Sequence, residues 1–204
     1  NNGFDEYFGI PYSNDMGPRP GNGRFSKFPP TPLIEGTEVI EEDPDQRYLT
    51  KRYTEKALDF IQRKKGESFF LYLPYTMPHT PIFASEKFKG TSRRGLYGDV
   101  VSEIDWSVGE ILKTLKELDL QNKTFVFFTS DNGPWLVKKE RGGSAGPLHE
   151  GKYTTWEGGM REPAIAWWPG VIPAGKTEAA MVSSLDIFPT CAALAGAQIP
   201  EEKV

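Results

Sequence analysis

The chain has 204 residues, of which 28 are acidic and 24 basic, for a net charge of −4. A chain of this length can bury a sizeable core as one domain. Its basic residues are spread along the sequence, which argues against the basic face that a nucleic-acid-binding protein needs. Its apolar runs are much shorter than the roughly 20 residues of a membrane-spanning helix, so we expect no membrane span.

Residues 1–45 are rich in proline, glycine and aromatic side chains and show little periodicity. Proline lacks a backbone N–H and breaks regular elements, and it recurs here at Pro11, Pro18, Pro20, Pro29, Pro30 and Pro32. Aromatic side chains are too frequent for a disordered segment. We therefore predict an irregular but ordered surface excursion.

Three stretches predict helices. Apolar residues recur at helical spacing from Asp45 to Lys65, and Gly66 ends that stretch. A second stripe predicts a helix over about 101–118, with an inward face formed by Val101, Ile104, Val108, Ile111, Leu112, Leu115 and Leu118. A short apolar stretch over 185–195 predicts a last helix.

Three short apolar runs, over 68–74, 124–129 and 164–168, have the pattern of strands buried on both faces. They alternate with the predicted helices, as strands do in an α/β domain. The fold class that we predict is therefore α/β, with a largely parallel (mixed) sheet flanked by helices. We expect residues 46–204 to form this α/β core.

Asp131 and Asn132 directly follow the strand predicted over 124–129. Open α/β sheets place ligand sites at the carboxyl ends of their strands. A carboxylate and an amide oxygen side by side suit Ca²⁺, with Mg²⁺ as the alternative, because both ions take oxygen ligands. Aspartate, asparagine and glycine are also ordinary turn residues. Two ligands do not complete a coordination shell, so others must come from elsewhere.

Two further side chains are candidates for a site. Lys152 lies in a glycine-rich stretch, residues 142–159, where the backbone can approach a ligand closely. Its ammonium can donate to anionic oxygens, although an arbitrary lysine is more often simply solvated. His79 lies between two prolines that stiffen its loop, although a single histidine is more often structural than catalytic. We expect the other histidine, His149, to be a loop residue near the site.

Cys191 is the single cysteine, so the chain has no internal disulfide. It lies in the last predicted helix, and no histidine or cation stands near it in the sequence to activate a thiolate. We expect a buried thiol that packs as a small apolar group.

Several motifs stand in order along almost the whole chain: Asn2-Gly-Phe-Asp-Glu-Tyr-Phe-Gly9, Phe69-Phe-Leu-Tyr-Leu73, His79-Thr-Pro-Ile-Phe83, Arg94-Gly-Leu-Tyr-Gly-Asp99, Thr129-Ser-Asp-Asn-Gly133, Gly151-Lys-Tyr-Thr-Thr-Trp-Glu-Gly-Gly159, Arg161-Glu-Pro-Ala164 and Ser184-Leu-Asp-Ile-Phe-Pro-Thr190. In these motifs the sequence resembles the sulfatase family of the alkaline phosphatase superfamily, and within it the arylsulfatase A and N-acetylgalactosamine-6-sulfatase branch. The resemblance implies an alkaline-phosphatase-like sulfatase domain that hydrolyses sulfate esters, with glycosaminoglycan sugars as candidate substrates.

The resemblance also implies roles for individual residues. Asp131 and Asn132 match two Ca²⁺ ligands. His79 matches a histidine that contacts the sulfate ester and assists departure of the alcohol, and Lys152 matches a lysine that holds a sulfate oxygen. A metal and an ammonium lower the barrier because negative charge grows on the oxygens as sulfur is attacked. A histidine can supply the proton that the leaving oxygen needs.

No nucleophile of this family lies in the chain. The resemblance implies a formylglycine made within a Cys/Ser-x-Pro-x-Arg motif, but Cys191 is followed by Ala-Ala-Leu-Ala. We expect the formylglycine upstream of Asn1. We interpret residues 1–204 as the latter portion of one catalytic domain, with its N-terminal part and its C-terminal subdomain absent. This portion alone should be inactive.

Two other functions stay open. A phosphate-ester hydrolase of the same superfamily would hold two Zn²⁺ with aspartate and histidine clusters, and the chain has only two histidines. A non-catalytic sulfatase-like domain would bind sulfated glycans without cleaving them, and a degenerate upstream nucleophile motif would favour that interpretation. By resemblance, we expect a lysosomal, periplasmic or secreted protein.

Overall fold

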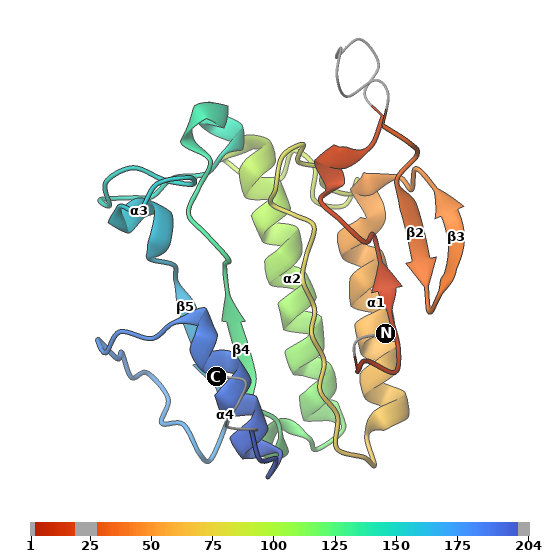
Figure 1. The fold of residues 1–204 in the computed structure, drawn as a ribbon, viewed down its shortest axis with the longest axis vertical. Coiled ribbons are helices and arrows are strands. Elements are labelled where there is room, and N and C mark those ends of the chain that lie inside the picture. Colours follow the sequence, from red (N-terminus) through yellow and green to blue (C-terminus); the bar gives the residue numbers. More distant parts are fainter. Residues whose placement is uncertain (1–2, 19–27, 200–204) are drawn as a thin grey trace.

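Two long helices stand side by side in the middle of the computed structural model, which describes residues 3–18 and 28–199 (Figure 1). They are α1, Leu49–Lys64, and α2, Gly95–Glu117. A small sheet beside α1 has three strands: β1 (Phe8–Gly9), β2 (Pro32–Glu35) and β3 (Glu38–Glu42). On the other side of α2 lie two strands and two short helices: β4 (Val126–Thr129), β5 (Ala164–Trp167), α3 (Glu157–Met160) and α4 (Ile187–Leu194). Short 3-10 helices complete the described elements: η1 (Asn14–Met16), η3 (Gln46–Tyr48), η4 (Gln121–Lys123), η5 (Leu136–Arg141) and η6 (Ser184–Asp186).

The first predicted helix is confirmed. Asp45 caps η3, the 3-10 turn that leads into α1, because its carboxylate accepts the backbone N–H of Arg47 at 3.1 Å. The apolar stripe of α1 then faces the core, where the buried residues are Leu49, Tyr53, Ala57 and Ile61. The helix therefore begins where a capping residue meets the first buried turn.

The second predicted helix is also confirmed, although it begins earlier, at Gly95. Its buried face differs at the start, since Val100 is 1% exposed whereas Val101, which we expect inside, is 43% exposed. Val100 and Ile104 belong to a buried cluster with apolar side chains of the 77–84 loop. Both valines border the apolar stripe, so helical spacing does not predict which of them is buried. The 77–84 loop packs on Val100 and buries it.

A chain of buried hydroxyl groups joins α1, α2 and the extended segment that precedes the 77–84 loop. Thr54 Oγ1 donates to the carbonyl oxygen of Thr50 at 2.7 Å and lies 2.5 Å from Ser107 Oγ. Because Thr54 uses its hydrogen on a carbonyl, Ser107 must donate to Thr54. The hydroxyl of Tyr75 then donates to Ser107 at 2.7 Å. All three hydroxyls are satisfied, and they tie the three segments together.

The expectation that prolines break every element of residues 1–45 is wrong. β1 pairs with β2 and β2 with β3, both antiparallel. β2 begins at Pro32, opposite Glu42 at the end of the ladder, where a missing N–H is tolerated. Gly36, with a φ of 61°, makes the turn between β2 and β3. Part of the predicted excursion, residues 19–27, lies outside the described residues.

The predicted presence of both helices and sheets is confirmed, but the described strands pair antiparallel where we expect mostly parallel pairing. β4 and β5 place Val126 opposite Trp167 and Thr129 opposite Ala164. Within the described ranges, the run 68–74 is assigned to no strand, so the strand expected there is not confirmed. An apolar run predicts an extended segment, but it does not say which strand lies beside it or in which direction.

The apolar runs are also more exposed than predicted. Phe70 is 57% exposed, Phe128 37% and Ile165 62%. Cys191 in α4 is a free thiol that is partly exposed rather than buried. The physical reason is that, in the described chain, few side chains pack over the 68–74 run, β4, β5 and α4. No helix in residues 3–18 and 28–199 has the length and apolar character needed to cross a membrane.

Candidate active site

His79 and Lys152 both lie against the indole ring of Trp135. The imidazole ring of His79 lies 5.8 Å from the indole ring of Trp135, centroid to centroid, with an interplanar angle of 32°. The ammonium of Lys152 lies 5.8 Å from the centroid of the same indole and 5.7 Å from that of the Tyr153 ring. Sequence reasoning missed Trp135, although its position just after the Asp131-Asn132 pair is a signal that could have found it.

Asp131 and Asn132 lie on the loop that follows β4, as predicted, and this loop continues into Trp135. The side-chain amide of Asn132 donates to the carboxylate of Asp131, so the two side chains lie together. The hydroxyl of Ser130 donates to the backbone oxygen of Asn132 at 3.1 Å and steadies the turn. The loop therefore presents a carboxylate and an amide oxygen next to each other.

This pair fits a hard divalent cation in its donor chemistry but supplies only part of a coordination shell. Ca²⁺ takes about six to eight oxygen ligands. Over the described ranges, 3–18 and 28–199, no group of three or more histidine, cysteine, aspartate or glutamate side chains could hold a metal. Asp131 and Asn132 would therefore hold such an ion only together with further oxygen ligands.

Backbone hydrogen bonds between loops, rather than apolar side chains, hold the arrangement. The N–H of Lys152 donates to the carbonyl oxygen of Pro134 at 2.9 Å, and the N–H of Gly133 donates to that of Gly159 at 3.1 Å. The loop after β4 is thereby fastened to the glycine-rich stretch at Lys152 itself and at Gly159. The position of the lysine and that of the Asp131-Asn132 pair are set by the same contacts.

Gly133 and Gly158 make this close approach possible. A Cβ atom on Gly133 would collide with the carbonyl oxygen of Gly158, and one on Gly158 would collide with the carbonyl oxygen of Glu150. Both obstacles are backbone atoms, which cannot swing aside as the end of a flexible side chain can. A larger residue at Gly133 would push the 131–135 loop away from the 150–159 loop, and one at Gly158 would distort the 150–159 loop itself.

Burial and a neighbouring cation favour the neutral form of His79. The pKa of His79 is lowered from its ordinary value, first by loss of solvent and then by the positive charge of Lys152. The negative charges of Asp15 and Asp131 act in the opposite direction. The ring of His79 thus responds to the lysine and to one of the two oxygen ligands that we predict for the same site.

Glu162 is a carboxylate beside the site that sequence reasoning missed. Its Oε1 atom is buried and, within the described part of the chain, has no hydrogen-bond partner. Burial raises the pKa of Glu162, and the negative charge of Asp131 raises it further. Glu162 precedes β5, but β5 pairs antiparallel with β4 and places Ala164 opposite Thr129, so Glu162 lies near the carboxyl end of β4. The sequence gives no sign of this, because it depends on the pairing direction.

His149 is a loop residue, as expected. Its backbone oxygen accepts the N–H of Gly158 at 2.8 Å, and its ring meets the ring of Trp156 edge to face at 5.0 Å. Its side chain is 68% exposed. His149 therefore belongs to the loop that carries Lys152 rather than to the group around Trp135.

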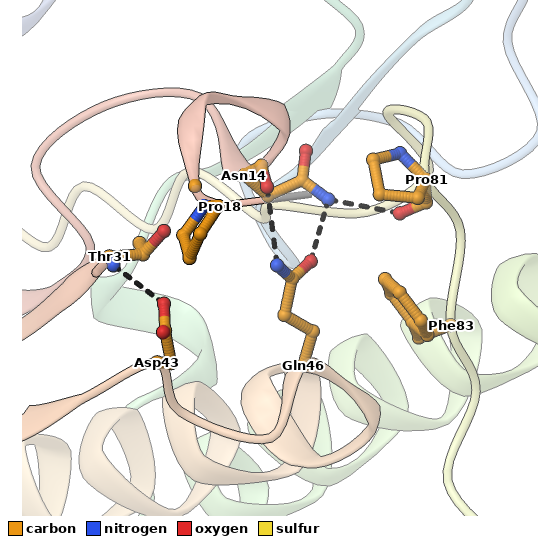
Figure 2. Close-up of a pocket in the computed structure, with 8 residues that line it drawn as sticks. Asn14, Pro18, Thr31, Asp43, Gln46, Pro81 and Phe83 are labelled. Carbon is orange, nitrogen blue, oxygen red and sulfur yellow. Dashed lines mark hydrogen bonds between the residues drawn. The ribbon is translucent and has the colours of Figure 1, made fainter. Parts of the chain in front are cut away.

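A cavity of about 310 Å³ lies beside the loop of His79, and Figure 2 shows residues that line it. Its wall is formed by Asn14, Gly17, Pro18, Thr31, Asp43, Gln46, Pro81 and Phe83. Asn14 is a fixed part of this wall, since its amide is hydrogen-bonded to both Gln46 and Pro81.

The sequence pattern of the family described as Sulfatase matches residues 1–197. The chain belongs to the sulfatase family. It is 47% identical to N-acetylgalactosamine-6-sulfatase of Canis lupus familiaris, over 99% of this chain and 40% of that protein. It is 42% identical to arylsulfatase A of Bos taurus, over 97% of this chain and 41% of that protein.

Solved structures share the fold of this sulfatase-family chain. The crystal structure of PsFucS1 sulfatase from Pseudoalteromonas sp. has a TM-score of 0.79 at 31% identity, over 85% of this chain and 37% of that chain. The crystal structure of Ps i-CgsB in complex with k-i-k-neocarrahexaose has a TM-score of 0.80 at 33% identity, over 98% and 47%. The α/β, alkaline-phosphatase-like fold class is thereby confirmed. The chain spans about 40% of the length of these curated relatives.

Proposed function

We propose that the protein to which this chain belongs hydrolyses sulfate esters. The observation that supports this most directly is the meeting of His79 and Lys152 around Trp135, in a chain of the sulfatase family. A partly buried histidine and an ammonium, near a pair of candidate oxygen ligands, can bind a sulfate ester. They can also stabilise the charge that grows on its oxygens during hydrolysis.

In this proposal Lys152 holds a sulfate oxygen as a point charge. Asp131 and Asn132 hold one Ca²⁺, with Mg²⁺ as the alternative, and such an ion supplies Lewis acidity when bound. The nucleophile is a formylglycine from outside this chain, whose sequence holds no Cys/Ser-x-Pro-x-Arg motif. The 204 residues alone then supply binding and acid–base groups without the attacking group.

His79 is the general acid of the proposed reaction. As the bond between sulfur and the ester oxygen breaks, its electron pair stays on that oxygen, which takes a proton from the imidazolium and leaves as the alcohol. Burial and then the positive charge of Lys152 lower the pKa of His79 in the free site. A bound sulfate anion opposes that charge, so substrate binding favours the protonated acid.

A sulfated glycan is the substrate class that we propose. Tyr153 is 78% exposed and meets Trp135 edge to face at 5.7 Å, while the ammonium of Lys138 lies 4.3 Å from the centroid of the Trp135 ring. Aromatic faces and lysines of this kind can pack on sugar rings and attract further sulfate groups. For a protein that acts on such glycans, we propose a lysosomal, periplasmic or secreted location.

The test is sulfate release by the full protein from an aryl sulfate, compared with phosphate release from the matched aryl phosphate. We expect the sulfate ester to be preferred and Lys152→Ala to lower kcat/KM by about 100-fold, since it removes a charge that stabilises the transition state. Lys113→Ala is the matched control, because Lys113 is an exposed lysine of α2 with a side chain 63% accessible.

Three outcomes would contradict the proposal in different ways. Equal losses of kcat/KM in Lys152→Ala and Lys113→Ala would contradict the role proposed for Lys152. Preference for the phosphate ester would favour the phosphate-ester hydrolase. Tight binding of a sulfated oligosaccharide by the full protein, without release of sulfate from any ester, would favour the non-catalytic binding domain.

A further inference from the structure

Asn14, in η1, contacts the edge of the His79 ring. Its side-chain Oδ1 lies 3.3 Å from Nδ1 of His79. Asn14 is only 3% exposed although its side chain is polar, so its hydrogen bonds are made inside the protein. No local sequence pattern points to Asn14, which is far from His79 along the chain.

The orientation of the Asn14 amide follows from its other partners. Its Nδ2 donates to the carbonyl oxygen of Pro81 at 3.0 Å and to Oε1 of Gln46 at 2.9 Å, as Figure 2 shows. Gln46 in turn donates from Nε2 to the backbone oxygen of Asn14 at 3.2 Å. A carbonyl oxygen can only accept, so an amide turned over would set two acceptors against each other at Pro81. The amide oxygen of Asn14 therefore faces His79.

This orientation decides which nitrogen of His79 carries the hydrogen. An amide oxygen accepts hydrogen bonds and cannot donate them, so Nδ1 must be the donor in the contact with Asn14. Nε2 is then the nitrogen whose proton can come and go. The indole of Trp135 lies against the ring, 5.8 Å away between centroids, and limits its rotation. The ring is thus held at one edge and covered on one face.

We propose that Asn14 is a positioning residue that holds His79 in the Nδ1–H form, so that Nε2 alone exchanges a proton with the sulfate ester. Its catalytic consequence rests on the proposed function. In the transfer, the Nε2–H bond of the imidazolium breaks, the proton joins the leaving oxygen, and Nδ1 keeps its hydrogen. Without Asn14, the hydrogen on Nδ1 loses this side-chain acceptor and the ring can turn more freely, although the backbone of Thr80 still interacts with the ring. The acid is then presented to the ester less often.

The kinetic test uses the full protein and a series of sulfate esters whose leaving groups range from nitrophenols to weakly acidic alcohols. A nitrophenolate leaves without help, whereas a weakly acidic alcohol needs the proton from His79. We expect Asn14→Ala to lower kcat by about 10-fold for the least acidic leaving group and by less than about 2-fold for nitrophenyl sulfate, with KM unchanged.

Gln46→Ala is the matched control. It removes hydrogen bonds from the same network but leaves the contacts of Asn14 with Pro81 and His79 in place. We expect it to destabilise the protein as Asn14→Ala does, without changing how kcat depends on the leaving group. A uniform loss over all esters in Asn14→Ala, or the same leaving-group dependence in both variants, would overturn the inference.

Nitrogen NMR of the His79 ring gives a second measurement that does not depend on activity. With the signals assigned by their absence in His79→Gln, the wild-type full protein should show hydrogen on Nδ1. Asn14→Ala should shift the hydrogen toward Nε2, the form that free histidine prefers. Hydrogen on Nε2 in the wild type would refute the positioning role even in an active sulfatase. Loss of the Nδ1 hydrogen only in Asn14→Ala, in a protein that releases no sulfate, would support the positioning role and refute the proposed function.

Discussion

The two sides of α2 are built in different ways. Toward α1, apolar side chains and buried hydroxyls pack together, and Leu49, Ile61 and Leu115 are each at most 1% exposed. On the other side, every buried residue described after Leu115 is a glycine: Gly133, Gly142, Gly151, Gly158 and Gly159. Side-chain packing holds one side and backbone packing holds the other. The comparison teaches that stability and site geometry depend on different residues.

The candidate site lies where the two sides meet. His79 and Asn14 belong to the side that is packed with side chains, whereas Asp131 and Lys152 belong to the side built on glycine. Reacting groups must be placed to within a fraction of an ångström, and a misplacement of about 1 Å can cost about 100-fold in rate. A change on either side should therefore act on the site only when it moves one of these groups.

The largest effect is expected for Leu115→Ala, which empties part of the side-chain core. Leu115 is 1% exposed, so we expect a loss of about 3 kcal/mol in the free energy of unfolding. Chemical denaturation of the full protein measures this loss. The kcat/KM of the folded variant for an aryl sulfate should stay unchanged. A fall in kcat/KM as large as that from a change in the glycine-built side would end the distinction between the sides.

Gly158→Ala should lower activity rather than stability. The added methyl group meets the carbonyl oxygen of Glu150, so the 150–159 loop must move. We expect kcat/KM to fall by about 100-fold, which corresponds to about 2.7 kcal/mol of transition-state stabilisation. Gly109→Ala is the matched control, because Gly109 lies in α2 and a Cβ atom there would have no contact within 4 Å. That control should keep its activity and gain up to about 1 kcal/mol of stability.

Tyr75→Phe tests the hydroxyl chain that joins the helices to the segment before His79. It removes the donor to Ser107, and we expect a loss of about 1 kcal/mol in the free energy of unfolding. Tyr72→Phe provides the comparison, because Tyr72 is 65% exposed and should tolerate the change with almost no loss. Equal stability of the two variants would show that the hydroxyl chain does not contribute.

The smallest effect is a pH dependence of stability at His79. Because its pKa is lowered in the folded protein, the unfolded chain binds more protons at this position. The resulting stabilisation is complete above the ordinary value of 6.5 and is lost as the pH falls toward the lowered pKa. We expect His79→Gln to flatten the dependence of the melting temperature on pH below about pH 6.5, and the same change at His149, whose side chain is 68% exposed, serves as the comparison. Identical slopes in the wild type and His79→Gln would contradict this.

Local patterns predicted a large part of the molecule. Both long helices follow from a stripe of apolar residues, and the place of Asp131 and Asn132 after β4 follows from a strand pattern that ends in polar residues. The prolines were a poorer guide, because Pro32 stands at the first position of β2, where its missing N–H costs little. Pairing directions were missed, since they depend on which strands meet and not on the residues of one strand.

Asn14 and Glu162 could not be selected from the sequence, because one acts through a partner that is distant along the chain and the other through burial. Trp135 stands just after the Asp131-Asn132 pair and could have been selected, but its contact with the ring of His79 joins distant segments and is visible only in the structure. A buried amide with all its bonds satisfied looks like any loop asparagine when it is read in sequence. Only the hydrogen bonds of Asn14 with the carbonyl of Pro81 and the ring of His79 indicate its role. The family motifs, in contrast, are short and ordered along the chain, so they could be recognised one by one.

The sequence by itself determined the α/β class, the two helices, and the residue types of the candidate site for which we propose sulfate-ester hydrolysis. Periodicity, capping and short motifs are local properties, and local physics is enough to specify them. Only the tertiary structure decided which strands pair, which valine of α2 faces inward, and how His79 is held between Asn14 and Trp135. These features depend on contacts between distant segments, whose geometry arises when α1, α2 and the glycine-rich loops pack together.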